Sequence, residues 1–175
     1  PPAGASTTDE IVLTKVDTTV DSAAVLCNGE PTDTGSSTAI YQVTLEDLTR
    51  AQLAGLRDSL RSPSDTSGIH MGWQHYIDEM GDATAEIFTT MTVSINGRNV
   101  GRERRFDSGE QNTEFVFTPV VRAPSLMRNG DVITIEVTSL ATAECNSGTG
   151  TFHQALAQAS TATYDGHTAH IDYSY

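Results

Sequence analysis

The sequence is short of lysine, cysteine and long apolar runs. Its single lysine is Lys15, and 10 basic residues face 23 acidic ones, which gives a formal net charge of −13. A surface this acidic repels phosphate backbones and anionic membranes, so we expect no nucleic acid among its partners. No window approaches the roughly 18 consecutive apolar residues of a membrane helix, so we expect no membrane insertion either.

The two cysteines, Cys27 and Cys145, lie far apart in the sequence. Zinc sites bring thiolates in pairs a few residues apart, so this spacing favours a disulfide, with two buried free thiols as the alternative. A disulfide closing so long a loop would stabilise the fold by about 4–5 kcal/mol, and it implies an extracellular or cell-surface location. The start at Pro1, with no Met and no apolar leader, fits a processed product, although any fragment boundary would look the same.

The motifs of nucleophilic catalysis are also missing. There is no G-x-S-x-G elbow, and a disulfide would consume both cysteines. A catalytic carboxylate pair cannot be recognised from spacing, because the fold sets its separation. We therefore expect no enzymatic activity and no cofactor, with a small secreted hydrolase as an alternative.

What the sequence does contain is a series of short segments with the composition of β-strands. They cover residues 10–16, 20–26, 38–43, 69–77, 86–95, 98–106, 113–121, 132–137, 150–163 and 169–175. Asn96-Gly97 favours a type I′ hairpin because both residues tolerate positive φ, and Pro119 indicates an edge strand or a bulge. So many short strands predict an antiparallel β-sandwich or jelly-roll-like fold, since a parallel sheet would need helices between most strands.

One amphipathic helix is predicted among the strands, over residues 45–60. Thr44 and Asp47 resemble a capping box, leucines follow one face, and the Ser62-Pro63 pair ends the helix.

The beginning of the chain differs in character from the rest. A polar, turn-prone arm leads into an apolar strand suited to adding an edge to another sheet. The apolar residues of this strand are Ile11, Val12, Leu13 and Val16. We therefore divide the chain into an N-terminal arm whose strand could be exchanged with a neighbour, residues 1–16, and a single β-sandwich domain, residues 17–175.

Five histidines offer nitrogen ligands for a metal. The close pairs are His70 with His75 and His167 with His170, and a third ligand would have to come from a residue such as His153 or Asp165. Both spacings place the two rings on opposite faces of a strand, because side chains alternate with period two. We therefore expect no metal centre built from either pair.

Acidic residues cluster in a segment that contains a glycine. Asp78, Glu79 and Asp82 have a spacing at which oxygen ligands can hold Ca²⁺. The full EF-hand series is missing, and a solvated acidic loop is the favoured interpretation.

Arg102, Arg104 and Arg105 form the one basic cluster of the chain. Such a patch could receive an acidic face of an identical neighbour. It could equally pair with the protein's own carboxylates or protect an edge strand.

Trp73 and Tyr76 are candidates for glycan contact, since aromatic faces stack on sugar rings. A lone tryptophan is more often an anchor of the core.

Two kinds of function remain in view. The leading hypothesis is a self-assembling extracellular subunit of a filament, pilus or surface layer, joined by an N-terminal strand inserted into a neighbouring copy. The alternative is a secreted carbohydrate-binding or adhesive β-sandwich module. The expected partners are therefore identical subunits or a glycan.

Overall fold

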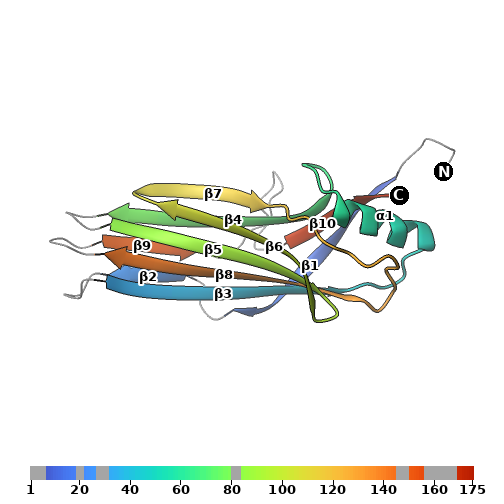
Figure 1. The fold of residues 1–175 in the computed structure, drawn as a ribbon, viewed down its shortest axis with the longest axis horizontal. Helices are drawn as coiled ribbons and strands as arrows, with labels where there is room; N and C mark the ends of the chain where they lie inside the picture. Colours follow the sequence, from blue (N-terminus) through green and yellow to red (C-terminus); the bar gives the residue numbers. More distant parts are fainter. Residues whose placement is uncertain (1–6, 19–21, 27–31, 80–83, 145–149, 156–168) are drawn as a thin grey trace.

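The computed structural model describes residues 7–18, 22–26, 32–79, 84–144, 150–155 and 169–175. The strands are β1 (Thr8–Thr18), β2 (Ser22–Leu26), β3 (Thr32–Thr44), β4 (Gly68–Glu79), β5 (Thr84–Ile95), β6 (Arg98–Ser108), β7 (Gln111–Phe117), β8 (Val132–Glu144), β9 (Gly150–Ala155) and β10 (Ala169–Ser174). The helix α1 (Arg50–Arg61) lies between β3 and β4 in the sequence. The predicted antiparallel β-sandwich with one inserted helix is confirmed (Figure 1).

The strands form two layers, which β1 joins. One layer runs β3-β8-β5-β6, and residues 14–18 of β1 add to it by pairing with β3. In the other layer β4 pairs with β7, β9 and β10, while β2 pairs with β9. Residues 8–13 of β1 pair with β10 in this second layer. A single strand therefore passes from one layer to the other.

The core lies between the layers, and α1 covers one end of it. Along β5 every second residue is buried, as expected for a strand with one face on the core. The largest fully buried side chains include Trp73, Tyr41, Tyr173 and Phe117. Leu56 and Leu60 bring the apolar face of α1 into the same core. The helix packs mainly against β10 and β4, at the end of the sandwich where β10 finishes (Figure 1).

The predicted hairpin is confirmed in detail. Asn96 and Gly97 have φ of 52° and 81°, the positive values that a type I′ turn needs at both central residues. They join β5 to β6, and Ile95 pairs directly with Arg98.

The helix begins later than predicted. Thr44 is the last residue of β3, and Asp47 has a φ of 57°, so neither belongs to the first turn of a helix. The capping box is made instead by Thr49 and Gln52, whose side chains each accept from the other's backbone N–H. Leu53, Leu56 and Leu60 lie on the helix and pack on the core, whereas Leu45 and Leu48, predicted for the same stripe, precede it. The end near Ser62 is as predicted.

Two strands are longer than their apolar segments. The sequence predicts strands over 38–43 and 132–137, whereas β3 and β8 each continue into polar stretches and pair in register along their whole length. Threonine favours extended backbone, and the outer face of a sandwich layer needs no apolar residues. In the opposite direction, β7 ends at Phe117, so Pro119 follows the strand.

The apolar segment near the N-terminus is not an arm outside the domain. The first half of β1 pairs with β10 and the second half pairs with β3. Leu13 is fully buried in the core and Ile11 packs against it, while Val12 and Val16 are about half exposed. The strand thus finds its partners within its own chain, and this arrangement gives no support to a strand inserted into a neighbouring copy.

The single helix in the described part of the chain is α1, with 12 residues. No helix there has the length and apolar character needed to cross a membrane.

Candidate functional site

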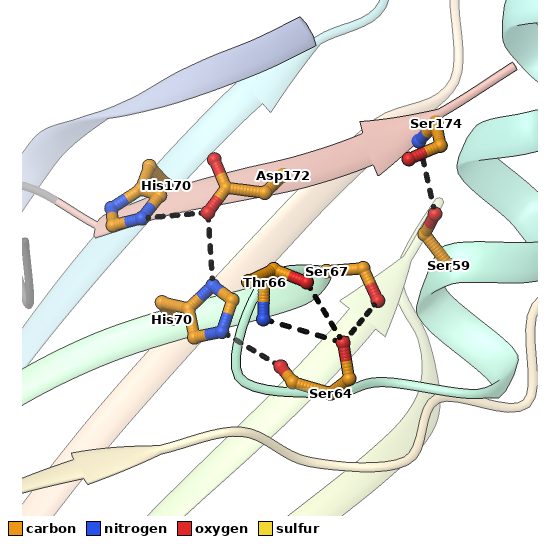
Figure 2. A network of polar contacts seen from close by, with 8 residues as sticks. All are labelled: Ser59, Ser64, Thr66, Ser67, His70, His170, Asp172 and Ser174. Carbon is orange, nitrogen blue, oxygen red and sulfur yellow. Dashed lines mark hydrogen bonds and ion pairs between the residues drawn. The ribbon is translucent and has the colours of Figure 1, made fainter. Parts of the chain in front are cut away.

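Two histidines and an aspartate from different strands converge on the outer side of the β4–β10 pair. His70 of β4 and His170 of β10 are directly opposite in the antiparallel register. Asp172 lies two residues further along β10 and therefore on the same face. Its Oδ2 lies 3.3 Å from His70 Nδ1 and 3.2 Å from His170 Nε2 (Figure 2). We call these three residues the histidine–aspartate cluster.

The cluster is largely shielded from water. His70 and His170 are 6% and 3% exposed, and Asp172 is partly exposed. The two rings are tilted against each other with centroids 5.4 Å apart. All three ligand atoms lie within 4.8 Å of one another, and they are nitrogen and oxygen donors of the kind that binds divalent transition metals.

A tight loop after α1 holds the far side of the His70 ring. His70 Nε2 lies 3.0 Å from the carbonyl oxygen of Ser64. Ser64 and Ser67 form an isolated backbone bridge, and the Ser64 hydroxyl contacts Ser67 Oγ and accepts from Thr66 N (Figure 2). Gly68 closes this loop with a φ of 97°, where a Cβ would lie 2.6 Å from the Cβ of Pro63. The sequence therefore builds a rigid support for one imidazole.

Negative charge gathers beside the cluster. Glu10 of β1 is directly opposite Asp172 across the β1–β10 pair, so the two carboxylates share one face of the sheet. Together with Thr8, Asp9 and Thr66 they line a surface hollow. Within the described residues, neither carboxylate is paired with a lysine or an arginine.

A second histidine–carboxylate contact lies on the inner side of β4. His75 is fully buried, and its Nε2 lies 3.2 Å from Asp107 Oδ2. Arg105 Nε donates to the same oxygen at 2.7 Å, and its guanidinium lies 4.1 Å from the centroid of the Phe115 ring. Burial lowers the pKa of His75; Asp107 acts in the opposite direction and Arg105 reinforces the effect of burial. We call His75, Asp107 and Arg105 the arginine-paired cluster.

The outer face of the other layer carries an exposed apolar row. Phe88 of β5 is directly opposite Leu140 of β8 on one side and Phe106 of β6 on the other. These side chains are 39%, 49% and 55% exposed, respectively. Polar residues flank the row: Thr138, Thr90 and Arg104 on one side, and Thr142, Glu86 and Ser108 on the other. The Arg104 guanidinium lies 5.9 Å from the centroid of the Phe88 ring. We call Leu140, Phe88 and Phe106 the apolar row.

The predicted basic cluster divides between the two faces of β6. Arg102 and Arg104 are exposed beside the apolar row, whereas Arg105 points inward to Asp107. All three arginines lie on a strand at the edge of its layer. The interpretation as pairing with the protein's own carboxylates therefore holds for Arg105, and protection of an edge fits Arg102 and Arg104.

The predicted glycan platform is not at Trp73. This side chain is fully buried on the inner side of β4, so no sugar can stack on it, and the interpretation as a core anchor is correct. For Tyr76 the structure describes the backbone, which pairs with Asn112 and His153.

The remaining predicted site residues lie at the end of a described strand or outside the described residues. Asp78 and Glu79 form the end of the β4 backbone, and Asp82, Cys27, Cys145, Asp165 and His167 lie outside the described residues. Leu26 and Glu144, which precede the two cysteines, end β2 and β8 at the same end of the sandwich (Figure 1). The disulfide therefore stays a prediction, compatible with the strands that lead to it.

Sequence reasoning placed His70 and His75 correctly on opposite faces of one strand, but it missed that His70 meets His170. Strand pairing, which spacing does not reveal, brings these two rings together. The available signal was His170-x-Asp172, two ligand types on one face of a terminal strand.

Comparison with known proteins finds distant structural neighbours but no family. No protein-family model and no curated protein matches the chain. Among solved structures, the carbohydrate-binding module TmCBM61 in complex with β-1,4-galactotriose is 12% identical with a TM-score of 0.25; the match covers 83% of this chain and 64% of that one. The family 11 carbohydrate-binding module from Clostridium thermocellum, in complex with a mixed-linked tetrasaccharide, is 12% identical with a TM-score of 0.26, covering 93% and 95%. The module CBM36, in complex with calcium and xylotriose, is 12% identical with a TM-score of 0.24, covering 95% and 98%. At these scores the likeness carries no argument about ligand or activity.

Proposed function

We propose that this chain is a secreted, non-catalytic β-sandwich module that binds a glycan on the outer face of the β3-β8-β5-β6 layer. The observation that carries the proposal is the apolar row, three large side chains exposed side by side on adjacent strands. Exposed apolar groups scattered singly are normal in soluble proteins, whereas contiguous ones mark an interaction surface.

The shape and surroundings of the row favour a sugar over a protein partner. The row is one side chain wide, and polar rows lie on both of its sides. Sugar rings have this same division, an apolar face of C–H groups edged by hydroxyls, and aromatic rings pack against that face. A stable protein interface buries about 800 Å² on each partner around a wider apolar centre, which three side chains do not supply.

The charged neighbours narrow the class of glycan. Within the described residues Arg102 and Arg104 make no ion pair, and Arg104 lies against Phe88. A guanidinium donates hydrogen bonds to sugar hydroxyls as well as to carboxylates. Because the net charge of −13 repels anionic polymers, we expect neutral polysaccharides to bind more tightly than acidic ones.

Affinity electrophoresis against a panel of neutral and acidic polysaccharides tests the proposal. Retardation by at least one polysaccharide is expected for the wild type, with loss of retardation in Phe88→Ala and Phe106→Ala. Leu140→Ala and Leu126→Ala form a matched pair, since Leu126 is 63% exposed but lies outside the layer that carries the row. Binding that survives in both phenylalanine variants, or no binding across the panel, would overturn the proposal.

Association of identical copies through the same row is the competing outcome. It would match the predicted self-assembly while using a route other than strand insertion. Sedimentation velocity separates the two, because a glycan-binding module stays monomeric over a wide concentration range. Oligomers of the wild type that dissociate in Phe106→Ala would favour the assembling subunit.

A further inference from the structure

We propose that His70, His170 and Asp172 form a binding site for one divalent transition metal ion of the Zn²⁺ class. The site lies on strands β4 and β10, in the layer opposite the apolar row, and is independent of glycan binding. The three side chains would supply two nitrogens and one oxygen, with a further position open toward the hollow beside Asp172.

The first support is the direction in which His70 presents its lone pair. A backbone carbonyl can only accept, so the contact with Ser64 O places the proton of a neutral His70 ring on Nε2. The deprotonated Nδ1 then faces Asp172 Oδ2 at 3.3 Å, one acceptor against another. Nδ1 is buried and has no hydrogen-bond partner among the described residues. A cation between these atoms would turn this repulsion into coordination.

The second support is the excess of negative charge. Glu10 lies directly opposite Asp172 on the same face of the sheet, an arrangement that is unfavourable for two like charges. No lysine or arginine in the described part of the chain forms an ion pair with either of them. The protein thus gathers anionic and lone-pair groups here without supplying a cation of its own.

The third support is the separation of the donor atoms. The Asp172 oxygen lies 3.3 Å from His70 Nδ1 and 3.2 Å from His170 Nε2, longer than the roughly 2.7–2.9 Å of a charge-assisted hydrogen bond. Metal–ligand bonds of about 2.0–2.1 Å in a tetrahedron place neighbouring ligand atoms about 3.3 Å apart. The two separations measured from the Asp172 oxygen agree with the tetrahedral value.

The surroundings also match a metal site. Histidine ligands commonly donate their second N–H to a backbone carbonyl, which fixes the ring, and Ser64 O does this for His70. Two imidazoles and one carboxylate select Zn²⁺, Co²⁺, Ni²⁺ or Fe²⁺ over Ca²⁺ and Mg²⁺, which prefer oxygen ligands. A bound ion would join the C-terminal strand β10 to the centre of its layer.

Titration calorimetry of the full chain, stripped with EDTA and then dialysed, tests the site. With ZnCl₂ we expect one ion per chain, and His70→Ala, His170→Ala and Asp172→Ala should each weaken binding by about 100-fold or more, since each removes one of three ligands. Millimolar CaCl₂ or MgCl₂ should not compete. Absorption of the Co²⁺-loaded chain in the visible region, with the intensity of a four-coordinate ion, is the second readout.

Two controls keep the test decisive. Asp107→Asn alters the arginine-paired cluster, on the inner side of β4, and should change zinc affinity less than twofold. The double variant His153→Ala, His167→Ala removes two histidines that could hold zinc nonspecifically, and should leave the one-to-one site intact. The proposal is overturned by the absence of a one-to-one site, or by zinc binding that persists unchanged in all three ligand variants. If the alanine variants do not fold, His70→Gln and Asp172→Asn provide the same comparison.

Discussion

Strand β4 carries two histidines that each meet a carboxylate at nearly the same distance, yet the two clusters are completed differently. Asp107 receives a guanidinium from Arg105 at 2.7 Å, so the arginine-paired cluster contains its own cation. Asp172 lies close to two imidazoles, and the residue opposite it on β1 is Glu10, another carboxylate. The same pair of residue types is therefore internally neutralised in one place and left with an excess of acceptors in the other.

The difference follows from which elements cover each face of β4. The inner face looks across the sandwich to β6, the most arginine-rich strand, whose Arg105 also rests on the Phe115 ring. The outer face at His70 is covered by the Ser64 loop and by β10, which offer a carbonyl, an imidazole and a carboxylate. We therefore interpret the His75–Asp107 contact as structural and the His70–Asp172 contact as part of the proposed metal site.

The largest difference in stability between the two clusters should appear when the carboxylate of each is removed, with EDTA present to exclude metal ions. We expect Asp107→Ala to lower the free energy of unfolding by about 2–3 kcal/mol, because it leaves His75 buried without a partner and Arg105 without its counterion. Asp172→Ala should cost less than about 0.5 kcal/mol, because it removes an acceptor that faces another acceptor and relieves repulsion with Glu10. Urea unfolding measures both. Equal losses would show that the histidine–aspartate cluster is already satisfied, for instance by a proton.

A smaller effect is expected at the loop that supports His70. Gly68→Ala should lower the free energy of unfolding by about 1–2 kcal/mol, because alanine fits poorly at positive φ and its Cβ would collide with Pro63. The shifted loop should also weaken zinc binding by about 10-fold through the Ser64 carbonyl. Gly109→Ala is the matched control: its φ is 82°, but a Cβ there meets nothing within 4 Å. This control should lower the free energy of unfolding through the unfavourable positive φ alone, and it should leave zinc affinity unchanged.

The smallest effect is a dependence on pH that belongs to the arginine-paired cluster. Burial holds the pKa of His75 below its ordinary value of 6.5, so near that pH the unfolded chain binds more protons than the folded one. Stability from this residue is therefore fully present above pH 6.5 and is lost as the pH falls toward the lowered pKa. Urea unfolding of His75→Leu at pH 7.5 and pH 5.5 should show a smaller loss on acidification than the wild type. A loss of the same size in both proteins would assign the acid sensitivity to other groups.

The fold could be predicted from the sequence because its main signals are local. Asn96-Gly97 determines the hairpin, and alternation along β5 identifies its buried face. The helix start was predicted wrongly because two similar capping patterns lie close together, and pairing of Thr44 in β3 leaves only the one at Thr49 available. Polar strands such as the first half of β3 have no apolar signal to detect.

The candidate sites depend on contacts that one sequence does not display. His70 and His170 meet through strand pairing, and the apolar row forms because three strands place one outward residue each in the same register. A partial signal for the row was present, since Phe88 and Leu140 interrupt the polar side of otherwise alternating strands. That Trp73 lies inward and Arg104 outward depends on which face of each strand meets the core.

The pairing of β1 with β10 also determines how the module would respond to force. Thr7 and Tyr175 exchange backbone hydrogen bonds of 2.9 Å in both directions, so the two ends of the described chain leave the sandwich side by side (Figure 1). Tension applied through both ends would act across the antiparallel pair and break its hydrogen bonds one after another, beginning at this contact. Such a geometry unzips at low load, whereas strands pulled along their length must break many bonds together. A module pulled through both ends would therefore unfold at low force. A module attached at this end alone, and binding its ligand on the distant sheet face, would not have its β1–β10 pair pulled apart.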